Sequence, residues 1–207
     1  VERIVGRERF DAWLQQWFDN HAFEPATSQL LLEDMQANLV RSPAEAEQLM
    51  LREWIFEPGL PSNVVKPDPQ AFATVDAAVR AYAADGTLPA GWDGWTAAEQ
   101  MRFLDNIPKE RTAAQLAALN DALGLSETGN NEVQFLWLEL ALANRYDPAV
   151  PQAETFLSEI GRAKFVRPLF AVLVGEGEWG RPIAERIYAR TRDGYHAVTR
   201  GGVDRLM

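Results

Sequence analysis

Apolar residues recur every three to four positions along most of the chain, which is the spacing of amphipathic helices. The clearest stretch runs from Glu8 to His21, where large apolar side chains occupy positions i, i+3, i+4, i+7 and i+8: Phe10, Trp13, Leu14, Trp17 and Phe18. No stretch alternates apolar and polar residues over the length of a strand. The pattern therefore predicts an all-α fold, and four tryptophans on apolar helix faces are interpreted as core residues: Trp13, Trp17, Trp54 and Trp137.

Helix-capping signals mark where further helices begin. Thr27 or Ser28 starts a second helix that reaches about Leu39, and Ser42-Pro43-Ala44-Glu45 reads as a capping box that starts a third, which ends near Trp54. The same signals predict the later helices at 72–84, from Thr96 onward, and at 112–124, 131–145, 148–160, 164–174 and 183–191.

Prolines divide the chain into two regions. Pro58-Gly59-Leu60-Pro61 is followed by Pro67 and Pro69, and proline removes the helical donor and favours extended backbone. We place a linker at residues 58–67, between a region of residues 1–57 and a domain of residues 68–207. Short helices joined by short turns in the second region favour antiparallel pairs stacked in layers, as in an α-solenoid.

Composition excludes some classes of partner. The 207 residues carry a net charge of −10, which argues against binding to nucleic acid or to an anionic membrane surface. No apolar run approaches the roughly 20 residues that span a bilayer. The chain has no cysteine, so it forms no disulfide and performs no thiol chemistry, and this fits the cytosol or the periplasm equally well.

The segment Gly161–Phe170 (GRAKFVRPLF) carries the strongest candidate chemistry. Two cations, Arg162 and Lys164, follow a helix-breaking glycine and precede an apolar run, so both are expected at a helix–helix junction. By themselves they allow two interpretations. They compensate a helix dipole and bond its free carbonyls, or they bind a carboxylate, to which arginine offers a planar fork and lysine a point charge.

Other motifs do not support chemistry in this chain. Gly175–Gly180 fits G-x-G-x-x-G, but it follows a helix and contains two glutamates, so we interpret it as an interhelical loop. The two histidines, His21 and His196, lie far apart, and neither belongs to the HExxH motif with which a zinc peptidase binds its metal. We expect no catalytic residue and no metal ligand here.

Four segments together resemble one family. GRAKFVRPLF is similar to a segment in the C-terminal domain of the leukotriene A4 hydrolase family, the bifunctional zinc aminopeptidases of the M1 class. WIFEPGLP (54–61), Asn130-Asn131-Glu132 with Trp137 and Leu138, and His196-Ala197-Val198-Thr199 match further family segments in the same order.

This resemblance implies a two-layer α-α superhelix of the armadillo or HEAT type, preceded by a few helices of a thermolysin-like catalytic domain. Residues 1–57 would be the last helices of that domain, and residues 68–207 the C-terminal helical domain. Arg162 and Lys164 would bind the carboxylate of a peptide substrate, and the catalytic domain of the same protein would be their partner. Zinc would lie in a part of the parent enzyme outside this chain, which alone would be inactive.

The resemblance implies a cytoplasmic enzyme, with the periplasm left open in case the parent carries a signal peptide. Residues 1–57, cut from their neighbours, would expose an apolar face near Phe10, Trp13 and Trp17 and self-associate through it. The alternative function is a non-catalytic α-solenoid that binds a partner protein. An HExxH motif in the upstream coding sequence would favour the enzyme.

Overall fold

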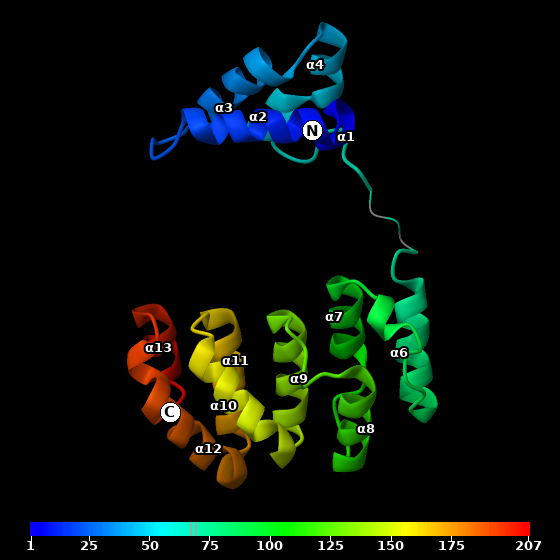
Figure 1. Cartoon of the computed structure of the whole chain (residues 1–207), viewed down its shortest axis with the longest axis vertical. Helices are drawn as coiled ribbons and strands as arrows, with labels where there is room; N and C mark the ends of the chain where they lie inside the picture. Colours follow the sequence, from blue (N-terminus) through cyan, green and yellow to red (C-terminus); the bar gives the residue numbers. More distant parts are fainter. Residues whose placement is uncertain (67, 69) are drawn as a thin grey trace. The chain divides into compact units, whose positions relative to one another are not determined.

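The computed structural model describes residues 1–66, 68 and 70–207, so that Pro67 and Pro69 of the proline-rich stretch lie outside the described residues. Every regular element in the described part is helical, which confirms the all-α prediction (Figure 1). The chain forms two compact units, Val1–Asp68 (unit 1) and Pro69–Met207 (unit 2). None of the described helices is long and apolar enough to cross a membrane.

Unit 1 is a small helical cluster. Its helices are α1 (Glu2–Val5), α2 (Arg7–Asn20), α3 (Ser28–Asp34), a π-helical turn (Met35–Leu39), α4 (Pro43–Leu49) and α5 (Leu51–Phe56). Thr27 caps α3 by accepting the Leu30 N–H, as predicted. The helix predicted from Pro43 to Trp54 is broken at Met50, whose φ of 49° is left-handed.

Two of the three tryptophans of unit 1 are buried, as the sequence predicted. Trp13 and Trp17 are 6% and 8% exposed, because α3 and the π-helical turn contribute Leu32, Met35 and Leu39 to the same core. The prediction that these two tryptophans belong to an exposed apolar face is therefore wrong, although Phe18 of the same helix is 65% exposed. Trp54, predicted to be buried, is 45% exposed. Amphipathic spacing found the helix that carries Trp13 and Trp17 but not what covers them.

Unit 2 contains eight α-helices among its described residues: α6 (Ala73–Asp85), α7 (Ala97–Asn106), α8 (Ala113–Leu123), α9 (Asn131–Ala143), α10 (Val150–Glu159), α11 (Ala163–Gly175), α12 (Gly177–Thr191) and α13 (Ala197–Val203). Short 3₁₀ turns lie at Trp92–Gly94, Asp147–Ala149 and Arg192–Gly194. Helices α7, α9, α11 and α13 lie side by side in one row, and α10 and α12 pack behind it (Figure 1).

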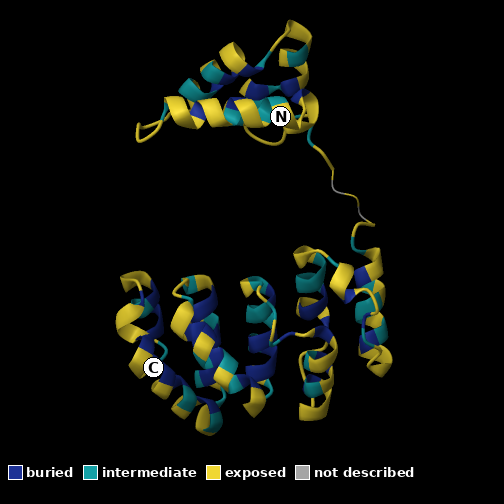
Figure 2. Cartoon of the chain, viewed as in Figure 1, coloured by how far each residue is buried: buried dark blue, intermediate teal, exposed yellow. Residues whose placement is uncertain are grey.

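The core of unit 2 runs between these layers. Buried residues line the facing sides of the helices, and exposed residues cover the outer faces (Figure 2). Trp137, Phe103 and Phe170 are among the largest side chains with almost no exposure. The capping boxes predicted at Thr96 and Thr112 are both present, with Glu99 and Gln115 bonding back to the cap residues. These reciprocal bonds satisfy free N–H groups and fix where α7 and α8 begin.

Two features of the last third differ from the sequence interpretation. Helix α12 begins at Gly177, so the Gly175–Gly180 segment is mostly helix and not a loop. A Cβ at Gly180 would lie 2.1 Å from the Leu173 carbonyl oxygen, so glycine is what allows α12 to approach α11 this closely. Helix α13 was not predicted. Its seven residues include two glycines, which weaken the helical signal.

Candidate functional site

Arg162 and Lys164 lie at the junction between α10 and α11, where the sequence placed them. Helix α10 ends at Glu159, and α11 begins at Ala163, so that Arg162 is its N-cap residue and Lys164 stands in its first turn. Both side chains are exposed. The apolar residues that follow are buried and fix α11 in the row: Phe165, Val166, Leu169 and Phe170.

The junction is held from two sides. The Thr199 hydroxyl of α13 donates to the Gly161 carbonyl at 3.1 Å, and the Tyr195 hydroxyl donates to the Leu157 carbonyl at 2.5 Å. His196 is the N-cap residue of α13, and its Nδ1 accepts the Val198 N–H at 3.2 Å, so this histidine has a structural role. The backbone that presents Arg162 and Lys164 is therefore tied to α10 and α13.

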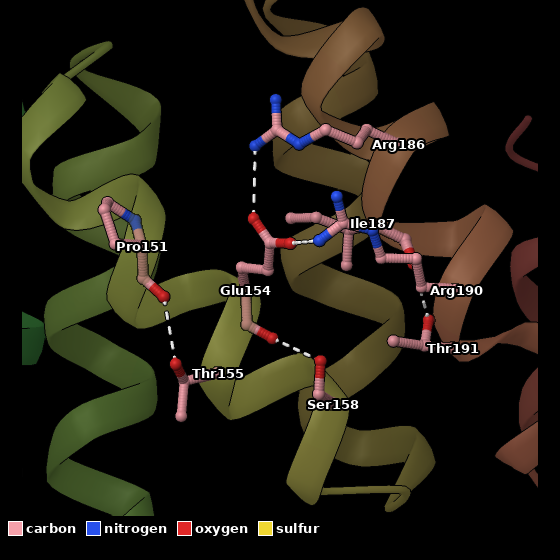
Figure 3. A network of polar contacts seen from close by, with 8 residues as sticks. All are labelled: Pro151, Glu154, Thr155, Ser158, Arg186, Ile187, Arg190 and Thr191. Atoms are coloured by element: carbon pink, nitrogen blue, oxygen red, sulfur yellow. Dashed lines mark hydrogen bonds and ion pairs between the residues drawn. The ribbon is translucent and has the colours of Figure 1, made fainter.

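Polar contacts of Glu154 connect α10 to α12. The Glu154 carboxylate accepts a bond from Arg186 at 3.3 Å and forms an ion pair with Arg190 (Figure 3). Within α10, the Ser158 hydroxyl donates to the Glu154 carbonyl at 2.7 Å. Because Glu154 lies one to two turns before the end of α10, this network steadies the helix that leads into the junction.

One aromatic ring lies beneath both cations. The Arg162 Cζ is 5.8 Å and the Lys164 Nζ 4.9 Å from the centre of the Phe165 ring. The ring itself is 4% exposed and packs on Phe135 and Phe156, with centre-to-centre distances of 5.4 and 5.8 Å. Cations within about 6 Å of an aromatic face are attracted to it. Phe165 therefore keeps both cationic groups close to the start of α11.

The two cations differ in their ionic partners. Lys164 Nζ forms an ion pair with the Glu132 carboxylate, which stands in the first turn of α9. Among the described residues, Arg162 has no carboxylate within ion-pair distance. Of these two cations, Arg162 is therefore the one whose guanidinium has no ionic partner in the described part of the chain.

The helix-compensation interpretation concerns the C-terminal end of α10, which Arg162 and Lys164 follow. Both also stand at the N-terminal end of α11, where the dipole is already positive and a cation is not favoured. Neither donates to a backbone carbonyl of a described residue. The N-termini of α9, α11 and α13 also meet at this edge of unit 2, because Lys164 pairs with Glu132 and Thr199 bonds Gly161 (Figure 1). Such an edge favours an anion.

The described residues do not fit a metal site. No group of three or more His, Cys, Asp and Glu side chains in residues 1–66, 68 and 70–207 could hold an ion. His21 instead packs on Trp17 at a tilted angle, with ring centres 4.0 Å apart, and lies 3.9 Å from the Asp34 carboxylate.

The fold defines a two-layer α-helical domain, and Arg162 and Lys164 lie exposed at one of its edges. The family model "Leukotriene A4 hydrolase, C-terminal" matches residues 95–207, which is more than half of the chain and includes Glu132, Arg162 and Lys164. The chain therefore belongs to the leukotriene A4 hydrolase C-terminal family.

Curated relatives cover nearly the whole chain. Leucine aminopeptidase 2 of Ajellomyces capsulatus is 25% identical over 224 residues, which include 99% of this chain and 34% of that protein. Leucine aminopeptidase 2 of Emericella nidulans is 27% identical with the same coverage. The solved structure of native yeast LTA4 hydrolase matches 99% of the chain with a TM-score of 0.63 at 18% identity, which supports the fold. The chain spans about a third of the length of these proteins.

Proposed function

We propose that this chain is the C-terminal part of a zinc aminopeptidase, and that unit 2 forms one wall of its substrate site. The family membership and the relatives named leucine aminopeptidase 2 support this proposal. The observation that carries it is the exposed Arg162 guanidinium, which lies at the N-terminus of α11 without a carboxylate partner in the described chain. The substrate would be a short peptide with a free C-terminal carboxylate.

Arg162 would bind this carboxylate through two parallel N–H···O bonds, because its guanidinium is planar and presents donors in a fixed fork. Lys164, paired with Glu132, would stand beside it as the second substrate-carboxylate residue. Binding the far end of the peptide would position the N-terminal residue for hydrolysis in the catalytic domain, which would be the partner of unit 2 in the same protein.

Zinc would supply an activated water to this reaction. Since the described residues of this chain do not fit a metal site, we assign the zinc to the part of the parent that this chain does not span, and no step here passes through it. Residues 1–57 would be the last helices of the catalytic domain, residues 58–67 a linker, and residues 68–207 the C-terminal domain. The chain alone would not cleave peptides. The proposed location of the parent is the cytoplasm, which fractionation of cells would test.

A comparison between a peptide acid and its C-terminal amide tests the role of Arg162 in the full-length enzyme. Wild type should prefer the acid. Arg162→Ala should lower kcat/KM for the acid by about 2–4 kcal/mol in transition-state free energy, because a charge-assisted bidentate contact is lost. Arg162→Lys should recover part of the loss, since an ammonium cannot reproduce the fork.

Turnover of the amide is the control. Arg162→Ala should leave it nearly unchanged, because the amide never engages the fork. Equal losses on acid and amide would show that Arg162 supports the fold of the junction and would refute its binding role. Peptidase activity of the isolated 207-residue chain, surviving controls for contaminating proteases, would contradict the assignment of the catalytic centre to the rest of the parent.

A further inference from the structure

Glu132 distinguishes two cations that the sequence places at the same helix junction. Its carboxylate pairs with Lys164, while Arg162 has no such partner among the described residues. Arg162 and Lys164 share the Phe165 ring, so a charge placed near one is felt by the other. The three side chains together carry one net positive charge, and that charge resides on Arg162.

Glu132 is held firmly enough to act in this way. It stands in the first turn of α9, where the Asn130 side chain accepts its backbone N–H at 3.0 Å. The next residue, Val133, is fully buried in the core of unit 2. A carboxylate is favoured at the N-terminus of a helix. Lys164, by contrast, stands at the N-terminus of α11, where its own helix disfavours a cation and Glu132 offsets the cost.

We propose that Glu132 is a positioning residue whose ion pair with Lys164 makes Arg162 the group that binds the substrate carboxylate. By holding and neutralising Lys164, it leaves Arg162 as the group with an uncompensated charge. This inference rests on the proposed function and deepens it. It implies that Lys164 would also bind the substrate carboxylate if Glu132 were removed.

A purely structural role for the ion pair predicts a different outcome. If the Lys164–Glu132 contact only joins α9 to α11, Glu132→Gln should weaken the domain and slow the acid and the amide peptide alike. If Glu132 controls the charge of the site, the same substitution should change the ratio of acid to amide turnover. The ratio therefore separates the two roles.

The experiment follows this ratio of kcat/KM values through a series of variants of the full-length enzyme. Arg162→Ala should erase the preference for the acid, because the remaining Lys164–Glu132 pair carries no net charge. Adding Glu132→Gln to Arg162→Ala should restore an acid preference of about three- to tenfold, the size expected for one unit charge at a partly solvated site. Adding Lys164→Ala as well should erase it again.

Two further variants serve as controls. Glu132→Gln alone should raise the acid preference above that of wild type, mainly through a lower KM, whereas Glu132→Asp should keep the wild-type ratio because it keeps the charge. Circular dichroism and the Tm of each variant verify that the domain is folded.

The results also separate this inference from the proposed function. If wild type shows no acid preference, the proposed function fails. If wild type prefers the acid and Arg162→Ala erases this preference, but Glu132→Gln restores nothing, the positioning role is overturned while the proposed function stands. If the acid preference restored by Glu132→Gln persists after Lys164→Ala is added, the positioning role is overturned as well, because the recovered charge would not belong to Lys164.

Discussion

The two units of this chain differ in how completely they bury their large apolar side chains. Unit 2 buries a continuous core between two helical layers, and Val198 is its one strongly exposed large apolar side chain among the described residues. Unit 1 has a core of eight buried residues. All remaining exposed large apolar side chains of the described chain belong to unit 1: Val1, Ile4, Phe18, Phe23, Trp54, Phe56, Leu60 and Val65.

This difference shows that helical patterning is not sufficient for an independent domain. Every helix of unit 1 has apolar positions, yet α5 leaves Trp54 and Phe56 half-exposed. Small domains also bury less of their chain, about 60% of the unfolded surface at 60 residues against about 70% at 150. Unit 2 thus has the properties of a self-sufficient domain, and unit 1 those of a region that depends on further contacts.

The largest expected effect is the difference in stability between the two units when each is expressed alone. Residues 70–207, expressed alone, should remain helical and unfold cooperatively, whereas residues 1–68 should unfold at much lower denaturant concentration, because their core is small and their apolar surface is exposed. Circular dichroism during urea titration of each piece measures this. A midpoint for residues 1–68 equal to that of residues 70–207 would contradict the comparison.

Replacing one tryptophan in each unit with alanine should lower the free energy of unfolding by different amounts. Trp137→Ala in α9 should lower the free energy of unfolding by about 3–5 kcal/mol, because it leaves a cavity in the core. It also leaves Gln152 without the bond that the Trp137 indole donates at 3.1 Å.

Trp54→Ala in α5 is the matched substitution in unit 1. It should cost under about 1 kcal/mol, because the side chain is already half-exposed and surface changes have small effects. Its indole donates to Asn63 at 2.8 Å, and this exposed bond is replaced by water at little cost. Denaturant unfolding of both variants of the whole chain gives the two values, and a similar loss for both would refute the distinction between the cores.

Much of this architecture could be predicted from local sequence. Capping boxes at Thr96 and Thr112, the left-handed Gly124 and the start of α11 after Gly161 are set by neighbouring residues, so their signals are complete in a short stretch of sequence. The start of α12 could not be predicted, since Pro182 lies inside it and glycines open it. Its helical form depends on packing against α11, which no local signal reports.

The same limit applies to the candidate site. The spacing of Arg162 and Lys164 placed both at a helix junction, but it did not show which of them would have a carboxylate partner. Glu132 lies 32 positions before Lys164 and meets it only because α9 and α11 are neighbours in one row. Long-range ion pairs of this kind require the tertiary structure. The one available signal was that Glu132 falls within a segment that resembles the family.

One hydrogen-bonded carboxylate in each unit offers a finer comparison. In unit 2, Asp204 accepts bonds from Arg192 and from the Tyr188 hydroxyl, and these hold the pKa of Asp204 below its usual range. Burial and the bond to Asp204 raise the pKa of Tyr188 to about 12. In unit 1, the Arg41 N–H and the Arg9 guanidinium lower the pKa of Glu45.

The smallest expected effect is the acid response of these two carboxylates. Because the folded-state pKa of Asp204 lies below its unfolded value of about 3.9, its stabilising contribution is complete above that value and is lost as the pH falls through the folded pKa. Asp204→Asn should therefore flatten the loss of stability of residues 70–207 between pH 5 and pH 2, and Glu45→Gln should do the same for unit 1. Asp204 is exposed and Glu45 is only partly buried, so each change should be smaller than that of Trp137→Ala. Urea unfolding at successive pH values measures the slopes, and a slope for Asp204→Asn equal to that of wild type would show that Asp204 keeps an ordinary pKa in the folded chain.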